Sequence, residues 1–184
     1  MGNLEPQRMS AQEFTRWEAE QDTRFEFVDG EVFAMTGGTY AHDRVRTNIS
    51  ALLLGHLRGT PCRVMGPEVM LRVDADSPGF YPDLLVACRS IDPNASSVSE
   101  AKLIIEVLSP STEKKDRGGK WIEYQKLSML EEYLIIDPER RRIEIFRRID
   151  ATDWRLHLCS RNEVVRFESV DLTTTFEIVF EDLG

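Results

Sequence analysis

The chain has 184 residues, of which 41% are hydrophobic and 30% charged, which suits one globular domain with a core of its own. It contains no run of about 18 apolar residues, and its first residues lack the layout of a secretion signal, so we expect neither a membrane protein nor an exported one. Lys and Arg number 23 against 32 Asp and Glu, a formal charge of −9. Any nucleic-acid role therefore requires a local basic patch.

The cysteines predict a reducing compartment. Cys62, Cys88 and Cys159 are an odd number and include no C-x-x-C spacing. This pattern argues against a disulfide framework and against a four-thiolate zinc site. We therefore expect a cytoplasmic protein with free thiols.

The first half of the chain predicts helices and a hairpin. Residues 1–9 are expected to be a flexible tail. Ser10 and Glu13 have the spacing of a capping box, which predicts a short helix. Asp29 and Gly30, between two apolar runs, predict a hairpin turn. Residues 41–57 place apolar side chains at helical spacing, including Leu54, so we expect a helix packed on a sheet.

The second half predicts a mixed sheet. Residues 62–66, 68–73, 80–88 and 102–109 are short apolar runs, and the last two read as strands buried on both faces. A basic helix is expected over residues 116–130, followed by a hairpin of residues 133–138 with 141–148. The tail, including residues 176–180, reads as further strands. The fold class is therefore α/β (α+β), a mixed β-sheet flanked by helices with a β-rich C-terminal extension, in a single domain over residues 1–184.

Two acids interrupt the buried runs. Asp83 follows Tyr81 and Pro82, and Glu106 lies inside LIIEVL. A buried carboxylate is costly unless a cation or a metal compensates it. If the two strands pair, both carboxylates point to one site, which fits Mg²⁺ or Mn²⁺ bound by oxygen ligands. Such an ion would activate a water for attack on phosphate.

A lysine completes the candidate site. Lys120 shares a helix face with Tyr124 and Leu127, so its side chain is expected to turn toward the sheet. There it could orient water or stabilise negative charge in the transition state. Asp83 could instead cap a turn, Asp116 could be a helix N-cap, and Glu106 could simply form a salt bridge with Lys120.

Four segments carry a resemblance to a known family. The strings FEFVDGEVFAMTGGTYAHDRV, FYPDLLVAC, LIIEVLSPSTEKKDRGGKWIEY and EEYLIIDPERRRIEIFRR occur in this order between Phe25 and Arg148. Together they resemble the Uma-type restriction-endonuclease-like family, a branch of the PD-(D/E)XK nuclease superfamily. IEVLSPST followed by DRGGK is the most specific part.

The resemblance implies a metal-dependent endonuclease that hydrolyses phosphodiester bonds of DNA through a metal-activated water. Asp83 and Glu106 match the motif's acids and would be the metal ligands. The motif's lysine should stand at Leu108, and the resemblance assigns it to Lys120 instead. An additional acid would be Glu26 or Glu31, and the choice between them stays open.

The remaining expectations concern partners. Five arginines between residues 140 and 148 and the basic residues from 114 to 120 could contact the DNA backbone without sequence specificity, or could serve solubility. His42 could be a packed histidine or line the site. A homodimer is possible, because double-strand cutting needs two sites. The alternative function is a catalytically inactive nuclease-fold module that binds nucleic acid or protein.

Overall fold

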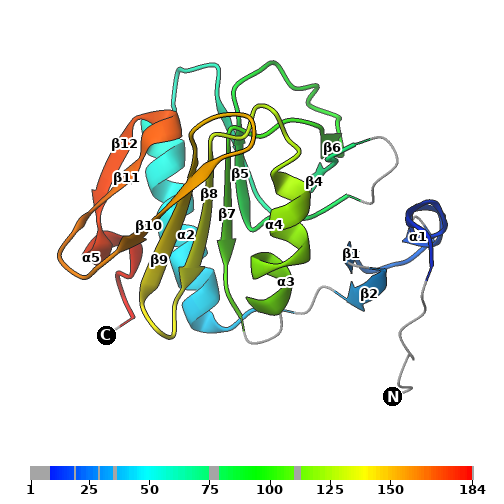
Figure 1. Cartoon of the computed structure of the whole chain (residues 1–184), viewed down its shortest axis with the longest axis horizontal. Coiled ribbons are helices and arrows are strands. Elements are labelled where there is room, and N and C mark those ends of the chain that lie inside the picture. Colours follow the sequence, from blue (N-terminus) through cyan, green and yellow to red (C-terminus); the bar gives the residue numbers. More distant parts are fainter. Residues whose placement is uncertain are drawn as a thin grey trace.

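The computed structural model describes residues 9–18, 20–28, 30–34, 37–74, 79–109 and 113–183. Its centre is a six-stranded sheet with helices on both faces (Figure 1). The N-terminal helix and hairpin lie at the opposite end of the molecule from the C-terminal ribbon, the two-stranded sheet of residues 164–175. No helix in these ranges is long and apolar enough to cross a membrane.

The N-terminal elements follow the local sequence signals. Helix α1 (Ala11–Glu18) begins at the capping box, where the Ser10 amide donates to the Glu13 carboxylate over 2.7 Å. Strands β1 (Phe25–Val28) and β2 (Glu31–Ala34) form the antiparallel hairpin, with Gly30 at φ +84° in its turn. The helix and the hairpin are therefore confirmed, while Asp29 lies outside the described residues.

Helix α2 (Tyr40–His56) is confirmed with a narrower apolar face than expected. The Thr39 side chain caps it by accepting from the His42 amide. Its buried residues are Val45, Ile49 and Leu53, a single row with a spacing of four. The expectation for Leu54 is wrong, since this side chain is 53% exposed.

The six-stranded sheet has the order β10-β9-β8-β7-β5-β3. Only β7 and β8 run parallel, and the other neighbours are antiparallel, so the sheet is mixed as predicted. The bounds are β3 (Arg63–Met65), β5 (Leu84–Ala87), β7 (Leu103–Val107), β8 (Glu132–Asp137), β9 (Arg142–Arg148) and β10 (Trp154–Cys159).

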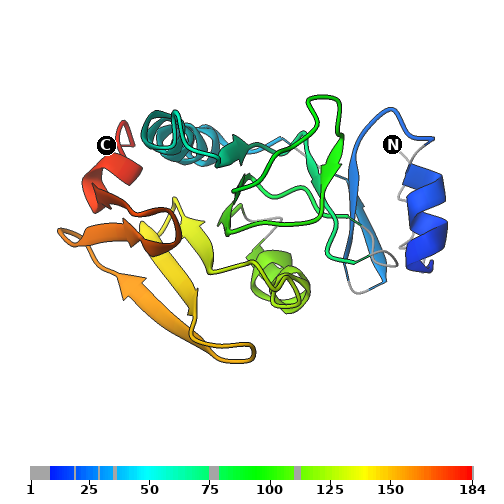
Figure 2. The same cartoon turned by 90° about the horizontal axis from the view of Figure 1, so that it is seen from above.

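Helices cover both faces of this sheet (Figure 2), and an apolar core lies on each face. On one face α2 packs over alternate residues of β5, β7, β8 and β9. On the other face α4 (Gly119–Tyr124) contributes Tyr124 to a cluster with Ile104, Tyr133 and Ile135. Strands β5 and β7 are buried along their whole length, as their continuous apolar runs predict, and β8 is buried along its whole length as well.

The helix expected over residues 116–130 is divided and shorter. Helix α3 (Glu113–Arg117) ends before Gly118, and α4 follows directly and ends at Tyr124. Two consecutive glycines favour such a break because they carry no helix-stabilising side chain.

The C-terminal segment differs from the predicted series of strands. Strands β11 (Val164–Phe167) and β12 (Leu172–Thr175) pair antiparallel with a 3₁₀ turn, Glu168–Val170, between them. Residues 176–180, expected as a strand, instead contain helix α5 (Phe176–Val179). Thr175 caps this helix, and burial of Phe176, Val179 and Phe180 follows helical spacing. The small two-stranded sheet of β4 (Met70–Leu71) and β6 (Ser97–Val98) is parallel.

The expectation of free thiols is wrong for Cys62 and Cys88, which form a disulfide, while Cys159 is free. Arg63 of β3 pairs with Ala87 of β5, so the next pair outward along the two strands is Cys62 and Cys88. Their Cα atoms lie 3.8 Å apart. Strand pairing, which residue spacing does not reveal, brings the thiols together.

Candidate active site

The two strand acids meet, as the sequence predicts. Leu84 of β5 pairs with Ile105 of β7, so Asp83 and Glu106 are opposite each other one position further along. The Asp83 amide donates to Glu106 Oε2 over 3.3 Å, and the Val107 amide donates to Asp83 Oδ2 over 2.8 Å. Both carboxylates are thus held by backbone groups of the neighbouring strand.

Lys120 reaches the same place from α4. Its Nζ lies 3.1 Å from Glu106 Oε1, 2.8 Å from Glu26 Oε1 and 3.2 Å from Asp116 Oδ1. The lysine is only 2% exposed. One helical turn later, the Tyr124 hydroxyl donates to Glu106 Oε1 over 2.9 Å. The helix therefore presents two donors to one carboxylate oxygen.

The two hairpin acids, Glu26 and Glu31, differ in burial and in their contacts. Glu26 is buried on β1 and accepts from the Tyr81 amide at 3.4 Å as well as from Lys120. Glu31 begins β2, where its side chain is exposed. Of the two hairpin acids, Glu26 is therefore the one that contacts Lys120 beside Glu106.

Two further residues belong to the cluster, Asp116, which the sequence offered only as an N-cap, and His42, for which it left packing and site lining open. Asp116 lies inside α3, so it is not an N-cap, and it stands four positions before Lys120 on adjoining helices. His42 Nε2 lies 3.1 Å from Asp83 Oδ1, which favours site lining over simple packing. Its Nδ1 is buried without a hydrogen-bond partner among the described residues. The i, i+4 spacing from Asp116 to Lys120 is the sequence signal that could have predicted their contact.

Burial and charge perturb these groups strongly. Burial raises the pKa of Glu106 well above its usual value; Lys120 opposes this rise, while the charges of Asp116, Asp83 and Glu26 add to it. Burial alone would lower the pKa of Lys120, but the surrounding carboxylates outweigh it and raise that pKa. Similarly, the pKa of His42 is raised because Asp83 outweighs burial. Such perturbed groups cluster at functional sites.

The donor set fits a hard divalent cation. Asp83 and Glu106 offer adjacent carboxylates, and Glu106 lies in an environment where neighbouring acids disfavour its charge. A cation at these oxygens would offset that repulsion. Magnesium and manganese bind through oxygen ligands and tolerate one or two protein carboxylates.

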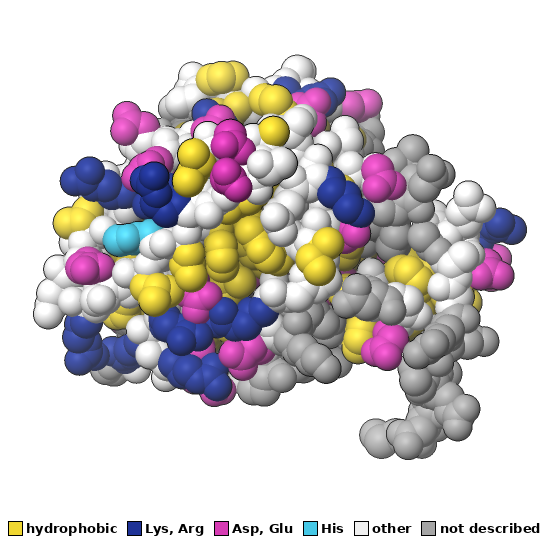
Figure 3. All heavy atoms as spheres, viewed as in Figure 1, with side chains coloured by type: hydrophobic (Ala, Val, Ile, Leu, Met, Phe, Trp, Pro, Cys, Tyr) yellow, Lys and Arg dark blue, Asp and Glu magenta, His cyan; other side chains and the backbone are white. Residues whose placement is uncertain are grey.

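Arginines of the predicted basic clusters form ion pairs with acids of the same chain. Arg117 forms a bidentate pair with Glu144 at 2.6 and 3.0 Å. Arg140 contacts Asp137 at 2.7 Å, and Arg147 contacts Glu132 at 2.8 Å. Figure 3 shows Lys and Arg side chains interspersed with Asp and Glu along one edge of this face. These arginines therefore stabilise the sheet and the adjoining helix.

Comparison with known proteins agrees with this architecture. The structure resembles a solved protein of Anabaena variabilis, described as "a putative nuclease belonging to DUF820", with a TM-score of 0.77 and 15% identity over 94% of this chain and 97% of that one. At this level of identity the likeness shows that the two chains share the fold of the mixed sheet flanked by helices.

The sequence comparison identifies the family. Residues 11–178 match the sequence model of Uma2, described as "Putative restriction endonuclease", and the chain belongs to this family. Two proteins of Synechocystis are each 28% identical to it. "Uncharacterized protein slr1290" matches over 96% of this chain and 94% of its own length, and "Uncharacterized protein sll1609" over 86% and 92%.

Proposed function

We propose that the protein is a metal-dependent endodeoxyribonuclease that hydrolyses phosphodiester bonds. The observation that carries the proposal is the contact of Asp83 with Glu106 on neighbouring strands, next to a buried lysine. A buried carboxylate, Glu106, beside a partly buried one, Asp83, is expensive for stability, so this arrangement favours a functional role. Membership of the Uma2 family supports the same reaction class.

Asp83 and Glu106 would hold Mg²⁺ or Mn²⁺. When bound, the ion would neutralise charge on the phosphate and lower the pKa of an attacking water. The Val107 amide fixes one Asp83 oxygen and His42 contacts the other, so the carboxylate is oriented before substrate binds. Such orientation avoids reorganisation during the reaction.

Lys120 would stabilise negative charge that develops on the phosphate. Its raised pKa keeps the ammonium charged at neutral pH. Glu26 and Asp116 contact the ammonium at 2.8 and 3.2 Å, so we assign them as positioning residues. Tyr124 fixes the Glu106 oxygen that also contacts the lysine.

Cleavage of supercoiled plasmid DNA in Mg²⁺ or Mn²⁺ tests the proposal. We expect Asp83→Asn and Glu106→Gln to lower the rate by at least about 100-fold, the scale for loss of one electrostatic group. Glu139→Gln is the matched control, because Glu139 is an exposed acid in the β8–β9 turn. Comparison of Glu26→Gln with Glu31→Gln decides which hairpin acid assists. Full activity in both Asp83→Asn and Glu106→Gln would refute the assignment.

The alternative is a binding module without catalysis. Pairing of Arg117, Arg140 and Arg147 with acids favours it, since these side chains offer little free charge to a DNA backbone. Absence of cleavage by well-folded wild-type protein, together with no retention of a plasmid fragment in a mobility-shift assay, would support a module that binds protein.

We also propose a homodimer, because cutting both strands requires two sites. Strand β10 is an edge of the six-stranded sheet and exposes Leu156 and Leu158, which are 48% and 54% exposed. Exposed apolar side chains on an edge strand favour association. Sedimentation equilibrium of wild type and Leu156→Asp would test this. A wild-type monomer at all concentrations would contradict it.

A further inference from the structure

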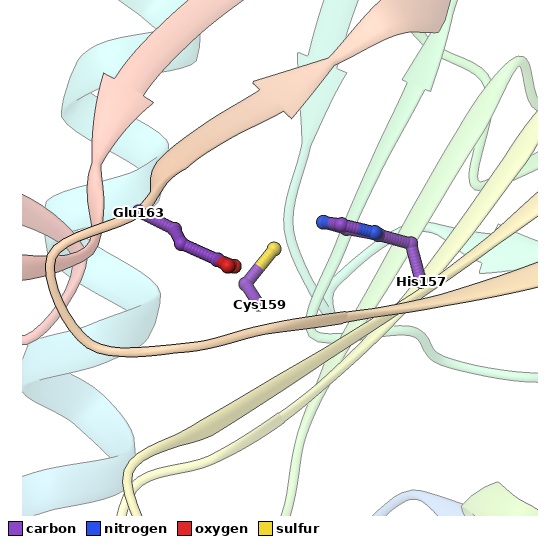
Figure 4. A group of neighbouring side chains, drawn as sticks. All are labelled: His157, Cys159 and Glu163. Atoms are coloured by element: carbon purple, nitrogen blue, oxygen red, sulfur yellow. The ribbon is translucent and has the colours of Figure 1, made fainter.

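A second group of metal-binding side chains lies on the edge strand and the turn that follows it. His157 and Cys159 are two positions apart on β10, so their side chains share one face. Glu163 is brought back toward them by the turn, where the Ser160 amide donates to Glu163 Oε2 over 2.8 Å. Figure 4 shows the imidazole and the carboxylate both directed toward the Cys159 sulfur.

We propose that His157, Cys159 and Glu163 bind a borderline transition-metal ion of the Zn²⁺ type. Their ligand atoms all lie within 4.8 Å of one another. One nitrogen, one thiolate and one carboxylate are the donor types that zinc takes in a tetrahedral site, and the thiolate excludes Mg²⁺ as a good ligand partner. A thiolate and a carboxylate also balance the charge of a divalent ion.

The surroundings give the ion access and do not repel it. A pocket of about 320 Å³ adjoins the cluster and is lined by His157, Glu163, Val164, Arg147, Arg166 and Glu168. The Arg147 guanidinium is held by Glu132 at 2.8 Å and by Glu168 at 3.3 Å. The Arg147 charge is therefore compensated by acids of the chain, and the open pocket, which Arg166 also lines, leaves room for water as the remaining ligand.

The Cys159 thiol is unsuited to nucleophilic chemistry. Burial, with a further contribution from the Glu163 carboxylate, raises the pKa of Cys159 to about 11. A thiol with so high a pKa is a poor nucleophile at neutral pH. A coordinated metal ion deprotonates such a thiol.

The site is separate from the proposed active site and shares no residue with it. Coordination would join the end of β10 to the turn that leads into β11, and so fix the C-terminal ribbon against the sheet edge. Metal ligation of this kind stabilises the folded chain. The site therefore has a structural role that does not depend on phosphodiester hydrolysis.

Titration with Co²⁺, a spectroscopic substitute for Zn²⁺, tests the proposal. The full chain with its Cys62–Cys88 disulfide intact has Cys159 as its one free thiol. A sulfur-to-cobalt charge-transfer band can then come from Cys159 alone. The titration is made in the Glu106→Gln protein, so that the candidate active site contributes little cobalt binding, and Zn²⁺ is then added in competition.

We expect the band to appear with a single Co²⁺ per chain, to disappear on Zn²⁺ addition, and to be lost in Cys159→Ala. His157→Gln and Glu163→Gln should weaken Co²⁺ binding by more than about tenfold, the scale known even for outer partners of metal ligands. Both residues are exposed, so these variants should fold. His56→Gln is the control, since His56 contacts the Val170 carbonyl instead. Absence of the band, or a band unchanged in His157→Gln, would overturn the proposal.

Discussion

Replacement of Lys120 by methionine is the sharpest test of how the candidate site is held together. Methionine keeps the length and the apolar stem but removes the charge. Glu26, Glu106 and Asp116 then lose the cation that contacts all three. Removal of one partner from a buried ion pair costs about 3–5 kcal/mol. For a chain of this size, the loss corresponds to a fall in Tm of about 6–20 °C.

The sign of the pH dependence follows from the carboxylates. The pKa of Glu106 is already raised in the folded protein and rises further without the lysine. A group with a raised folded pKa contributes stability that is present below its unfolded pKa and is lost as the pH rises through the folded value. Lys120→Met should therefore be closest to wild type at acidic pH and furthest from it at pH 8.

Urea unfolding followed by circular dichroism at pH 5 and pH 8 measures this free energy of unfolding. The matched control is Lys126→Met, because Lys126 forms an exposed pair with Glu123 whose loss should cost less than about 1 kcal/mol. Addition of Glu106→Gln to Lys120→Met should restore part of the loss. A loss below about 1 kcal/mol in Lys120→Met, or one equal at both pH values, would refute the reasoning.

Three further predictions concern stability outside the site. Arg148→Met should cost about 1–3 kcal/mol in thermal unfolding, because Arg148 donates to the carbonyl oxygens of Leu130, Gln125 and Leu127; an unchanged Tm would contradict this. Asp137→Asn should flatten the acid limb of the stability curve. Burial raises the pKa of Asp137 but hydrogen bonds from the Arg140 backbone and side chain outweigh it, so the pKa is lowered and stability is lost as pH falls through the folded value. A curve identical to wild type between pH 2 and about pH 5 would exclude that contribution. Reduction of the disulfide, which closes a separation of 26 residues, should cost about 3 kcal/mol in urea unfolding, and equal stability with and without reductant would contradict it.

The sequence alone was enough to single out the charged residues that lie within apolar segments. Asp83 and Glu106 stand out because each acid interrupts an apolar run, and the adjacent strands bring them together. Lys120 follows from its spacing to Tyr124, which indicates a face turned to the sheet. These inferences depend on local pattern and on the cost of burying charge, both of which are visible in a single chain.

What the sequence missed depends on pairing between distant segments. Glu26 and Glu31 have similar surroundings in sequence, and only the packing of the hairpin decides which one reaches Lys120. The Cys62–Cys88 bond likewise follows from the register of β3 with β5. Gly118 and Gly119 are a local signal for the division of the helix, but the basic segment over residues 116–130 was interpreted as one continuous helix.

Calorimetric titration with Mn²⁺ tests the central claim most directly. His157→Gln protein is compared with His157→Gln/Glu106→Gln protein, so that the edge-strand cluster contributes little in either sample. The account predicts saturable Mn²⁺ binding in the first protein and its loss in the second, with circular dichroism unchanged. Equal binding in both proteins, or no binding to the well-folded first protein, would contradict a metal site at Asp83 and Glu106.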